Sequence, residues 1–324
     1  MLNNSFRTEI KQPKVEYAIS HKNSILLMGS CFAENIGQKL SGYKFATHIN
    51  PFGILFNPLS ISQSLNILTD NFLFEESDLL LHKNEWISFS HHGRFSHSDK
   101  KECLKNINEK LLESRAFLQK ADLLILTLGT AVSYRYKGNI VANCHKIPQK
   151  EFQKQILSVG DIVSALGNSI EKIKFVNKDL RILFTVSPIR YIKNDMTENA
   201  LSKAQLLVAT HELLSGIENS DYFPAYEIMM DDLRDYRFYN QDMLHPSPLA
   251  IDYIWNKFSH RFFDKETTQQ NALINELILA KNHRLKNPFS AESKRFKEEQ
   301  LEKIRKIQTH YPQLDFEEEI KYFI

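Results

Sequence analysis

The chain has 324 residues, of which 42% are hydrophobic and 11% aromatic, so it can bury a sizeable core and is not globally disordered. Lys and Arg total 41 against 39 Asp and Glu, and the formal charge of +2 provides no broad basic surface for nucleic acid. We therefore expect a small-molecule partner.

The N-terminal residues lack the basic segment and apolar stretch of a secretory signal, and no run approaches about 18 consecutive apolar residues. Three cysteines occur, Cys31, Cys103 and Cys144, without the CxxC spacing of a disulfide framework or a thiolate zinc site. We expect a cytoplasmic protein that binds no membrane and holds no metal.

Three short apolar runs, each ending at small or turn-forming residues, predict buried parallel strands at 24–28, 122–128 and 181–186. Because helical patterns alternate with these runs, crossover connections and a parallel α/β sheet should follow. The helices are expected at 33–40, 59–68, 101–119, 162–175 and 200–214.

Ligands of open parallel sheets bind beyond the carboxyl ends of the strands. The residues that follow the three strands, 29–31, 129–130 and 187–190, should therefore converge on one rim of the sheet. Residues 131–141 have the pattern of a hairpin inserted after the second strand, where it could wall the site.

After residue 264 the sequence becomes charged and helical, with Asn287-Pro288 separating one helix from the next. We expect one domain over residues 1–264 and a helical extension over 265–324. The extension could serve packing or form a homo-oligomer.

The first chemical motif is Gly29-Ser30-Cys31, between a strand and a helix. Glycine permits a tight turn there, and the helix N-terminus supplies N–H groups that favour developing negative charge. The alternative is structural, with Ser30 capping the helix and Cys31 packed as a small hydrophobic residue.

The second motif is Asp242-x-x-His245, ahead of Ser247 and Pro248, which resemble the cap and first residue of a helix. The spacing lets the Asp242 carboxylate accept the Nδ1 proton of His245 and leaves Nε2 free to take a proton from a nucleophile. A lone DxxH pair is common in polar loops, so its value lies in the combination with the first motif.

Gly29-Ser30-Cys31-Phe32-Ala33 spells the motif of the GSCFA family, a branch of the SGNH (GDSL-like) hydrolase superfamily, and the chain resembles that family. The Asp242-x-x-His245 pair matches the superfamily's final block. The resemblance implies a three-layer α/β/α sandwich with a central parallel sheet and an ester or thioester hydrolase that needs no cofactor.

The superfamily's first block is Gly-Asp-Ser, which places Cys31 at the nucleophile position and Ser30 at the Asp position. Cys31 activated by His245 is the first choice, and Ser30 acting through a shifted turn is the second.

The resemblance also implies an oxyanion hole, for which Gly53 matches the second-block glycine; an ordinary turn is the equal alternative. The third block departs from the family pattern, because Gly129-Thr130 stands where Gly-x-Asn-Asp is expected. Loss of the Asn donor can cost about 3 kcal/mol unless Thr130 or another group replaces it. Gly129 and Thr130 complete the predicted oxyanion hole.

Asn50, Arg190 and His145 are assigned to substrate binding. The histidine-rich stretch 90–97 is interpreted as a polar loop over the sheet edge rather than a metal site.

By superfamily analogy the substrate is a small molecule of carbohydrate type that loses an acetyl or similar group. Two alternatives stay open. One is an acyltransferase that uses the same site, and the other is a catalytically degenerate binding or assembly module.

Overall fold

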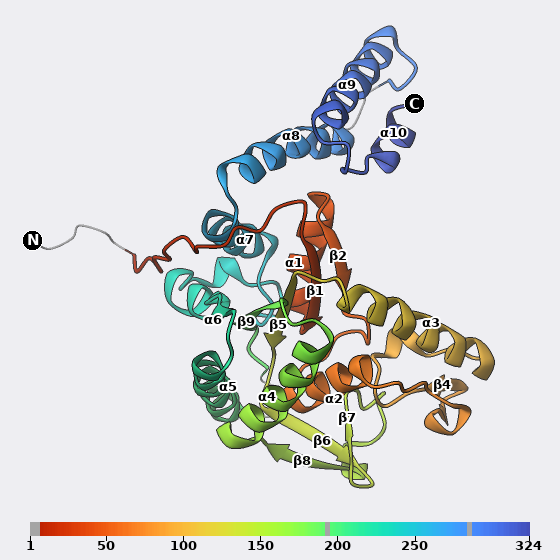
Figure 1. The fold of residues 1–324 in the computed structure, drawn as a ribbon, viewed down its shortest axis with the longest axis vertical. Coiled ribbons are helices and arrows are strands. Elements are labelled where there is room, and N and C mark those ends of the chain that lie inside the picture. The colour runs from red at the N-terminus through yellow and green to blue at the C-terminus, as the bar shows by residue number, and fades with distance from the viewer. Residues whose placement is uncertain (1–6, 192–194, 284–286) are drawn as a thin grey trace, which may run out of the picture.

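The computed structural model describes residues 7–191, 195–283 and 287–324 (Figure 1). Its centre is a five-stranded parallel sheet in the order β10-β9-β5-β1-β2. The strands are β1 (Ser24–Gly29), β2 (Ala46–Ile49), β5 (Leu123–Leu128), β9 (Arg181–Val186) and β10 (Ser220–Tyr222). The three predicted strands are its central members, whereas the short edge strands β2 and β10 lack a continuous apolar run and were missed.

Alternate residues of the strands enter two separate hydrophobic clusters, one on each face of the sheet. Leu26 and Met28 pack with α2 (Pro58–Thr69), α3 (Lys100–Leu118), α4 (Val159–Val176) and α5 (Met196–Gly216). Ile25 and Leu27 pack with α1 (Cys31–Gly42) and α7 (Pro248–Phe262). The predicted three-layer α/β/α sandwich is therefore confirmed (Figure 1).

Side-chain caps fix where several helices begin. Asn57 accepts the N–H of Ser60 ahead of Pro58, which starts α2. Ser158 and Asp161 form a capping box, so α4 begins three residues before the apolar pattern that predicted it.

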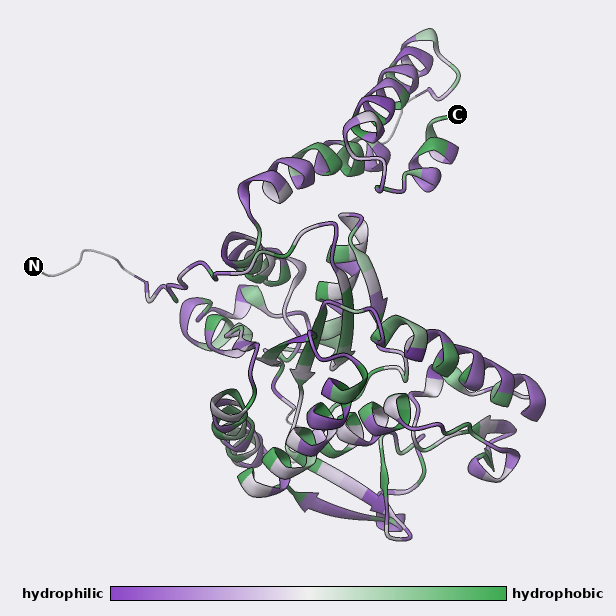
Figure 2. Ribbon diagram, in the orientation of Figure 1, coloured by the Kyte–Doolittle hydropathy of each residue, from purple (hydrophilic) through white to green (hydrophobic). Residues whose placement is uncertain are grey.

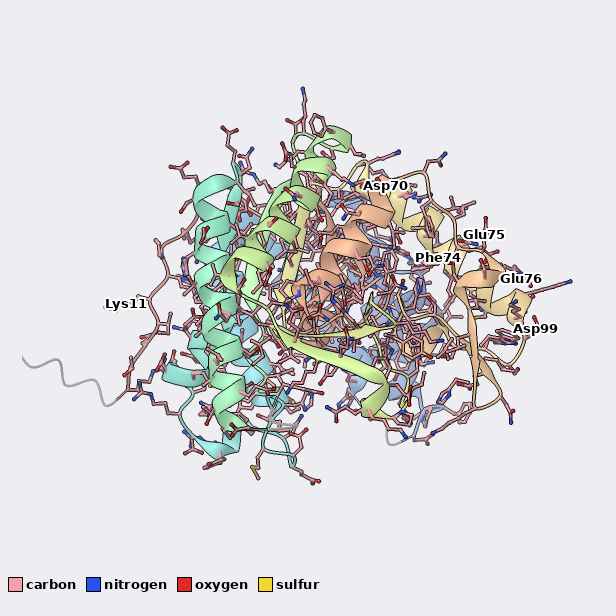
Figure 3. The ribbon with its side chains drawn as sticks, turned by 90° about the horizontal axis from the view of Figure 1, so that it is seen from below. Lys11, Asp70, Phe74, Glu75, Glu76 and Asp99 are labelled. Carbon is pink, nitrogen blue, oxygen red and sulfur yellow. The ribbon has the colours of Figure 1, made fainter. Side chains whose placement is uncertain are left out.

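Smaller elements surround the carboxyl ends of the strands. The predicted hairpin is present as β6 (Val132–Tyr136) and β7 (Asn139–Val141), and β8 (Phe152–Ile156) adds a third antiparallel strand. A second hairpin, β3 (Leu80–His82) and β4 (Glu85–Ile87), follows α2 in the chain. In this region Phe74 is buried, whereas the nearby side chains of Glu75, Glu76 and Asp99 are exposed at the surface (Figure 3).

Helices α8 (Lys265–Asn282), α9 (Ala291–His310) and α10 (Glu317–Phe323) stand at one end of the molecule beyond α7 (Figure 1). They enclose a third hydrophobic cluster that includes Ile274, Ile304 and Phe316, and much of the rest of these helices is hydrophilic (Figure 2). Lys44 forms an ion pair of 2.7 Å with Glu319 across the junction with the sandwich. In the part of the chain that the structure describes, no helix has the length and apolarity to cross a bilayer.

Candidate active site

The turn after β1 can be made only by glycine. Gly29 has a φ of +135°, and a Cβ added there would lie 2.1 Å from the carbonyl oxygen of Thr127. The N–H of Ser30 donates to that same carbonyl at 3.1 Å. The close approach of β5 therefore sets the direction in which the chain enters α1.

Asn50, which follows β2, holds this turn in place. Its side-chain Oδ1 accepts the N–H of Gly29 at 2.9 Å, and its backbone N–H donates to Leu27 at 2.8 Å. The residue is 1% exposed and does not line the cavity that contains Cys31. Asn50 therefore stabilises the turn at Gly29 and does not contact the cavity.

Ser30 and Cys31 occupy different positions at the start of α1. Ser30 is 2% exposed, and its Oγ accepts the N–H of Phe32 at 3.2 Å as the helix N-cap. Cys31 is the first residue of the helix and is partly exposed. Burial raises the pKa of the Cys31 thiol, while the N–H groups of Cys31 and Phe32 act in the opposite direction.

Asp242 and His245 form a hydrogen-bonded pair in the loop before α7. Asp242 Oδ2 lies 2.6 Å from His245 Nδ1, and Asp242 Oδ1 accepts the backbone N–H groups of Leu244 and His245 at 2.9 and 3.0 Å. These hydrogen bonds, with the backbone N–H of His245 first, lower the pKa of Asp242 to about 2. Met243 takes a φ of +57° between them, which closes the loop.

A cavity of about 420 Å³ brings the two motifs together at the carboxyl ends of β1, β5 and β9. Cys31 and His245 both line it, but no hydrogen bond joins Cys31 Sγ to the imidazole among the described residues. The remaining lining residues are Ser30, Phe56, Gly129, Thr130, Ser187, Ile189, Arg190, Tyr191 and Leu244. The segments expected to converge on one rim do so.

The three residues assigned to the oxyanion hole have their backbone N–H groups engaged elsewhere. Gly53 donates to the carbonyl of Asn50 at 2.7 Å and does not line the cavity. Gly129 and Thr130 line the cavity, but both donate to the carbonyl of Phe56 at 2.9 Å. In this conformation none of the three N–H groups is available to an oxyanion.

Ser187 offers a different donor in the same cavity. It follows β9, is 1% exposed, and its Oγ has no hydrogen-bond partner among the described residues. A hydroxyl of this kind can donate one hydrogen bond to a bound group. The sequence gives no local signal for this role, because Ser187 is an ordinary serine at a strand end.

The two remaining substrate-binding candidates lie in different places. Arg190 lines the cavity, and its Nε donates to Met230 Sδ at 3.1 Å. His145 instead lines an adjoining cavity of about 280 Å³ and contacts the carbonyl of Ser88 at 2.8 Å through Nε2. The two cavities share Phe56, Thr130 and Tyr191.

A buried lysine beneath the site was missed in the sequence. Lys203 on α5 is 2% exposed, and its Nζ donates to the carbonyls of Gly129 at 2.7 Å and Ser187 at 2.8 Å. Burial lowers the pKa of Lys203 to about 7. Its helical spacing from Asn199 and Leu206, which lie on the same buried face of α5, is the sequence pattern that could have indicated its burial.

The histidine-rich stretch differs from the expected polar loop. His91 is 1% exposed and packs against Phe52, Phe74 and Phe95, with ring centroids 4.8 to 5.0 Å apart. It therefore belongs to the core, because neighbouring aromatic residues enclose it. Within residues 7–191, 195–283 and 287–324, no three His, Cys, Asp or Glu side chains are grouped so as to hold a metal ion.

Two family models match the chain. The model described as "GSCFA family" matches residues 24–258, and the one described as "GSCFA domain protein, C-terminal domain" matches residues 274–323. No curated protein matches the chain. Among solved structures, the chain is similar to a Clostridium thermocellum family 3 carbohydrate esterase, with 10% identity, a TM-score of 0.35, and coverage of 73% of this chain and 94% of that one.

Proposed function

The chain belongs to the GSCFA family, and from this premise we propose that it hydrolyses an ester or thioester bond through Cys31, His245 and Asp242. The observation that carries the proposal is the cavity lined by both Cys31 and His245, with Nδ1 of His245 bonded to Asp242. Cys31 lies near the start of the sequence that forms the sandwich and His245 near its end, and both line the same cavity at the carboxyl edge of the sheet.

In the proposed reaction, His245 Nε2 takes the proton of the Cys31 thiol as sulfur attacks the carbonyl carbon. The tetrahedral intermediate collapses to an acyl-enzyme, and the leaving group departs with the proton from His245. Water then attacks the acyl-enzyme with His245 again as base. This second step releases the acid and restores the thiol.

Cys31 is preferred to Ser30 as the nucleophile because their contacts differ. Ser30 is almost fully buried and its Oγ is the acceptor of the helix cap, whereas Cys31 is partly exposed at the helix N-terminus. N–H groups at that position favour a thiolate. Ser30 thus serves to start the helix that presents Cys31.

The oxyanion is proposed to bind near Ser187 rather than Gly53. Ser187 lines the cavity and its buried hydroxyl has no partner among the described residues, while the N–H of Gly53 is engaged with Asn50. One preorganised donor of this kind is worth about 3 kcal/mol in the transition state.

The substrate is proposed to be a small hydroxyl-bearing molecule of carbohydrate type that carries an acetyl or similar acyl group. The main cavity of about 420 Å³ would hold the acyl group, and Arg190 would contact a polar or anionic part of the substrate. The adjoining cavity of about 280 Å³ would receive the alcohol.

The adjoining cavity also favours a second candidate function. An acceptor alcohol bound there could attack the acyl-enzyme in place of water, which would make the protein an acyltransferase. Partition of a labelled acyl group between water and added alcohols distinguishes the two activities.

The boundary between a hydrolase domain at 1–264 and a helical extension at 265–324 remains a proposal, as does a homo-oligomer formed through the extension. Leu273, Leu279 and Phe289 expose 40%, 62% and 96% of their surface there. Sedimentation analysis of the wild type and of Leu279→Ser tests the association.

The test of the proposed function is covalent labelling with a fluorophosphonate and with a thiol-reactive acyl probe, followed by peptide mapping. Labelling at Cys31 should fall sharply in His245→Ala. Labelling that is indifferent to His245, or absent, would contradict catalysis and favour a binding or assembly module.

A further inference from the structure

The loop that follows β5 has its backbone donors engaged within the protein. The four N–H groups of residues 129–132 donate to the carbonyl of Phe56 (Gly129 and Thr130, both 2.9 Å), to Ser202 Oγ (Ala131, 2.7 Å) and to Thr130 Oγ1 (Val132, 3.1 Å). The donor that this loop can still offer to a ligand is therefore the side-chain hydroxyl of Thr130.

The surroundings of Ser202 fix the direction of its hydrogen bond with Thr130. The two hydroxyl oxygens are 2.9 Å apart, and either could be the donor. Ser202 is 2% exposed, and in the part of the chain that the structure describes its proton has no acceptor other than Thr130 Oγ1. If Thr130 donated instead, the buried proton of Ser202 would have no hydrogen bond, which is unfavourable. Ser202 is therefore the donor.

Thr130 Oγ1 then has both of its acceptor positions filled, by Ser202 Oγ and by the N–H of Val132. Its own proton has no acceptor within residues 7–191, 195–283 and 287–324. Thr130 lines both the main cavity and the adjoining one. The protein thus orients this hydroxyl and leaves its proton for a molecule bound in the cavities.

We propose that Thr130 Oγ1 donates to the bridging oxygen of an ester, the atom that joins the acyl group to the alcohol, and so selects oxygen esters over thioesters. This inference rests on the proposed function, in which the main cavity holds the acyl group and the adjoining cavity holds the alcohol. The bridging atom of such a substrate lies where the two cavities meet.

The residues shared by the two cavities favour Thr130 for this contact. They are Phe56, Thr130 and Tyr191. Phe56 has no polar side-chain atom. Thr130 is 8% exposed and held by hydrogen bonds, whereas Tyr191 is 39% exposed. Ser187 lines the main cavity and not the adjoining one, so its proposed contact with the carbonyl oxygen is separate.

The donor acts when the alcohol leaves. As the tetrahedral intermediate collapses, the C–O bond breaks and its electron pair stays on the bridging oxygen, which takes a proton from the imidazolium of His245. Thr130 keeps its own proton and donates to another lone pair of the same oxygen, where negative charge develops. A bridging sulfur is a weak acceptor and gains little from this donor.

The experiment compares phenyl acetate with S-phenyl thioacetate, which share the acetyl group and the ring and differ in the bridging atom. A phenyl ring suits the adjoining cavity, because Tyr134 and Phe152 are among the residues that line it. Steady-state kinetics give kcat/KM for both compounds, and the ratio of variant to wild type is compared between them.

The variants at Thr130 remove or keep the hydroxyl. Thr130→Val replaces it by a methyl group, Thr130→Ser keeps it, and Thr130→Ala serves if Thr130→Val does not fold. The matched control is Thr210→Val on α5. Thr210 is fully buried, its hydroxyl donates to the carbonyl of Leu206 at 2.7 Å, and it lines neither cavity.

In Thr130→Val, kcat/KM for phenyl acetate should fall about tenfold, as for the loss of one hydrogen bond, while the value for S-phenyl thioacetate should change much less. Thr130→Ser and Thr210→Val should keep the wild-type ratio between the two compounds. An equal loss for both compounds in Thr130→Val, or no loss for either, would overturn the proposal.

A binding measurement separates this inference from the proposed function. Cys31→Ala cannot form the acyl-enzyme, and NMR titration gives its dissociation constants for the two compounds, with and without Thr130→Val. The second substitution should weaken binding of phenyl acetate about threefold or more and leave S-phenyl thioacetate unchanged. Equal effects on the two compounds would overturn the proposal.

The two ideas therefore fail separately. Absence of turnover in the wild type, together with the expected difference in binding, would reject hydrolysis and keep the Thr130 donor. Turnover in the wild type, with equal effects of Thr130→Val on the oxygen ester and the thioester, would keep hydrolysis and reject the donor.

Discussion

Oδ2 of Asp242 lies 2.6 Å from Nδ1 of His245, and the other oxygen of the same carboxylate accepts the backbone N–H of His245. The carboxylate thus fixes both the imidazole tautomer and the loop that carries it. The first prediction tests these two roles separately.

Asp242→Asn should lower kcat/KM for an ester substrate by about 10²-fold or more, because the amide can still accept the loop N–H groups but does not favour the same imidazole tautomer. The matched control is Asp235→Asn, since Asp235 also accepts a backbone N–H, that of Arg237 at 2.8 Å, and does not contact His245. Steady-state kinetics should show the loss of kcat/KM in Asp242→Asn and not in Asp235→Asn. Equal activity in the two variants would reject the role of Asp242.

The second prediction separates Ser30 from Cys31. Cys31→Ala should abolish acyl-enzyme formation and leave the fold intact, whereas Ser30→Ala should retain turnover. Because Ser30 caps α1, its loss should reduce the free energy of unfolding by about 1 kcal/mol. Intact-mass analysis after reaction with an acyl probe, paired with urea denaturation, checks both. Turnover that survives in Cys31→Ala but not in Ser30→Ala would assign the nucleophile to Ser30.

The third prediction concerns the oxyanion. Ser187→Ala should lower kcat by about 10²-fold with little change in KM, since the hydrogen bond is proposed to form in the transition state. Ser133→Ala is the control, because Ser133 is also fully buried without a partner among the described residues but does not line the cavity. A change in KM alone would make Ser187 a substrate contact instead.

The central strands could be predicted because continuous apolar runs such as Leu123–Leu128 are buried on both faces, and Gly29-Ser30-Cys31 marks the turn that follows the first of them. Contacts between segments that are far apart in the sequence could not be predicted in this way. The hydrogen bond from Gly129 to Phe56, and the carbonyls that hold Lys203, join parts of the chain with no common local pattern. The sequence therefore indicated which segments meet, but not which donors remain free there.

The fourth prediction tests the turn at Gly29. Gly29→Ala places a Cβ 2.1 Å from the carbonyl of Thr127 at a φ of +135°, so it should destabilise the protein by about 3 kcal/mol or more. Gly216→Ala, at the end of α5 with open space around its Cβ position, should be tolerated. Thermal denaturation of both variants measures the difference. Comparable stability would mean that the β1–α1 turn relaxes and does not constrain Cys31.

The fifth prediction follows from the buried imidazole of His91. Burial lowers the pKa of His91 to about 3, well below its ordinary value of 6.5. Below pH 6.5 the unfolded chain therefore binds a proton at this site that the folded protein does not bind. The contribution of His91 to stability is complete above about pH 6.5 and is lost as the pH falls toward 3, by about 1.4 kcal/mol per pH unit.

His91→Phe keeps an aromatic ring among Phe52, Phe74 and Phe95 and removes this titration. Urea denaturation at pH 7.5 and pH 5.0 should show that the wild type loses about 2 kcal/mol more than the variant between the two conditions. The variant also loses the 2.9 Å contact between Nδ1 and Ser88 Oγ, which should lower its stability at both pH values equally. Parallel losses in the two proteins would show that His91 takes up its proton in the folded state, and the aromatic cluster would then be open to water.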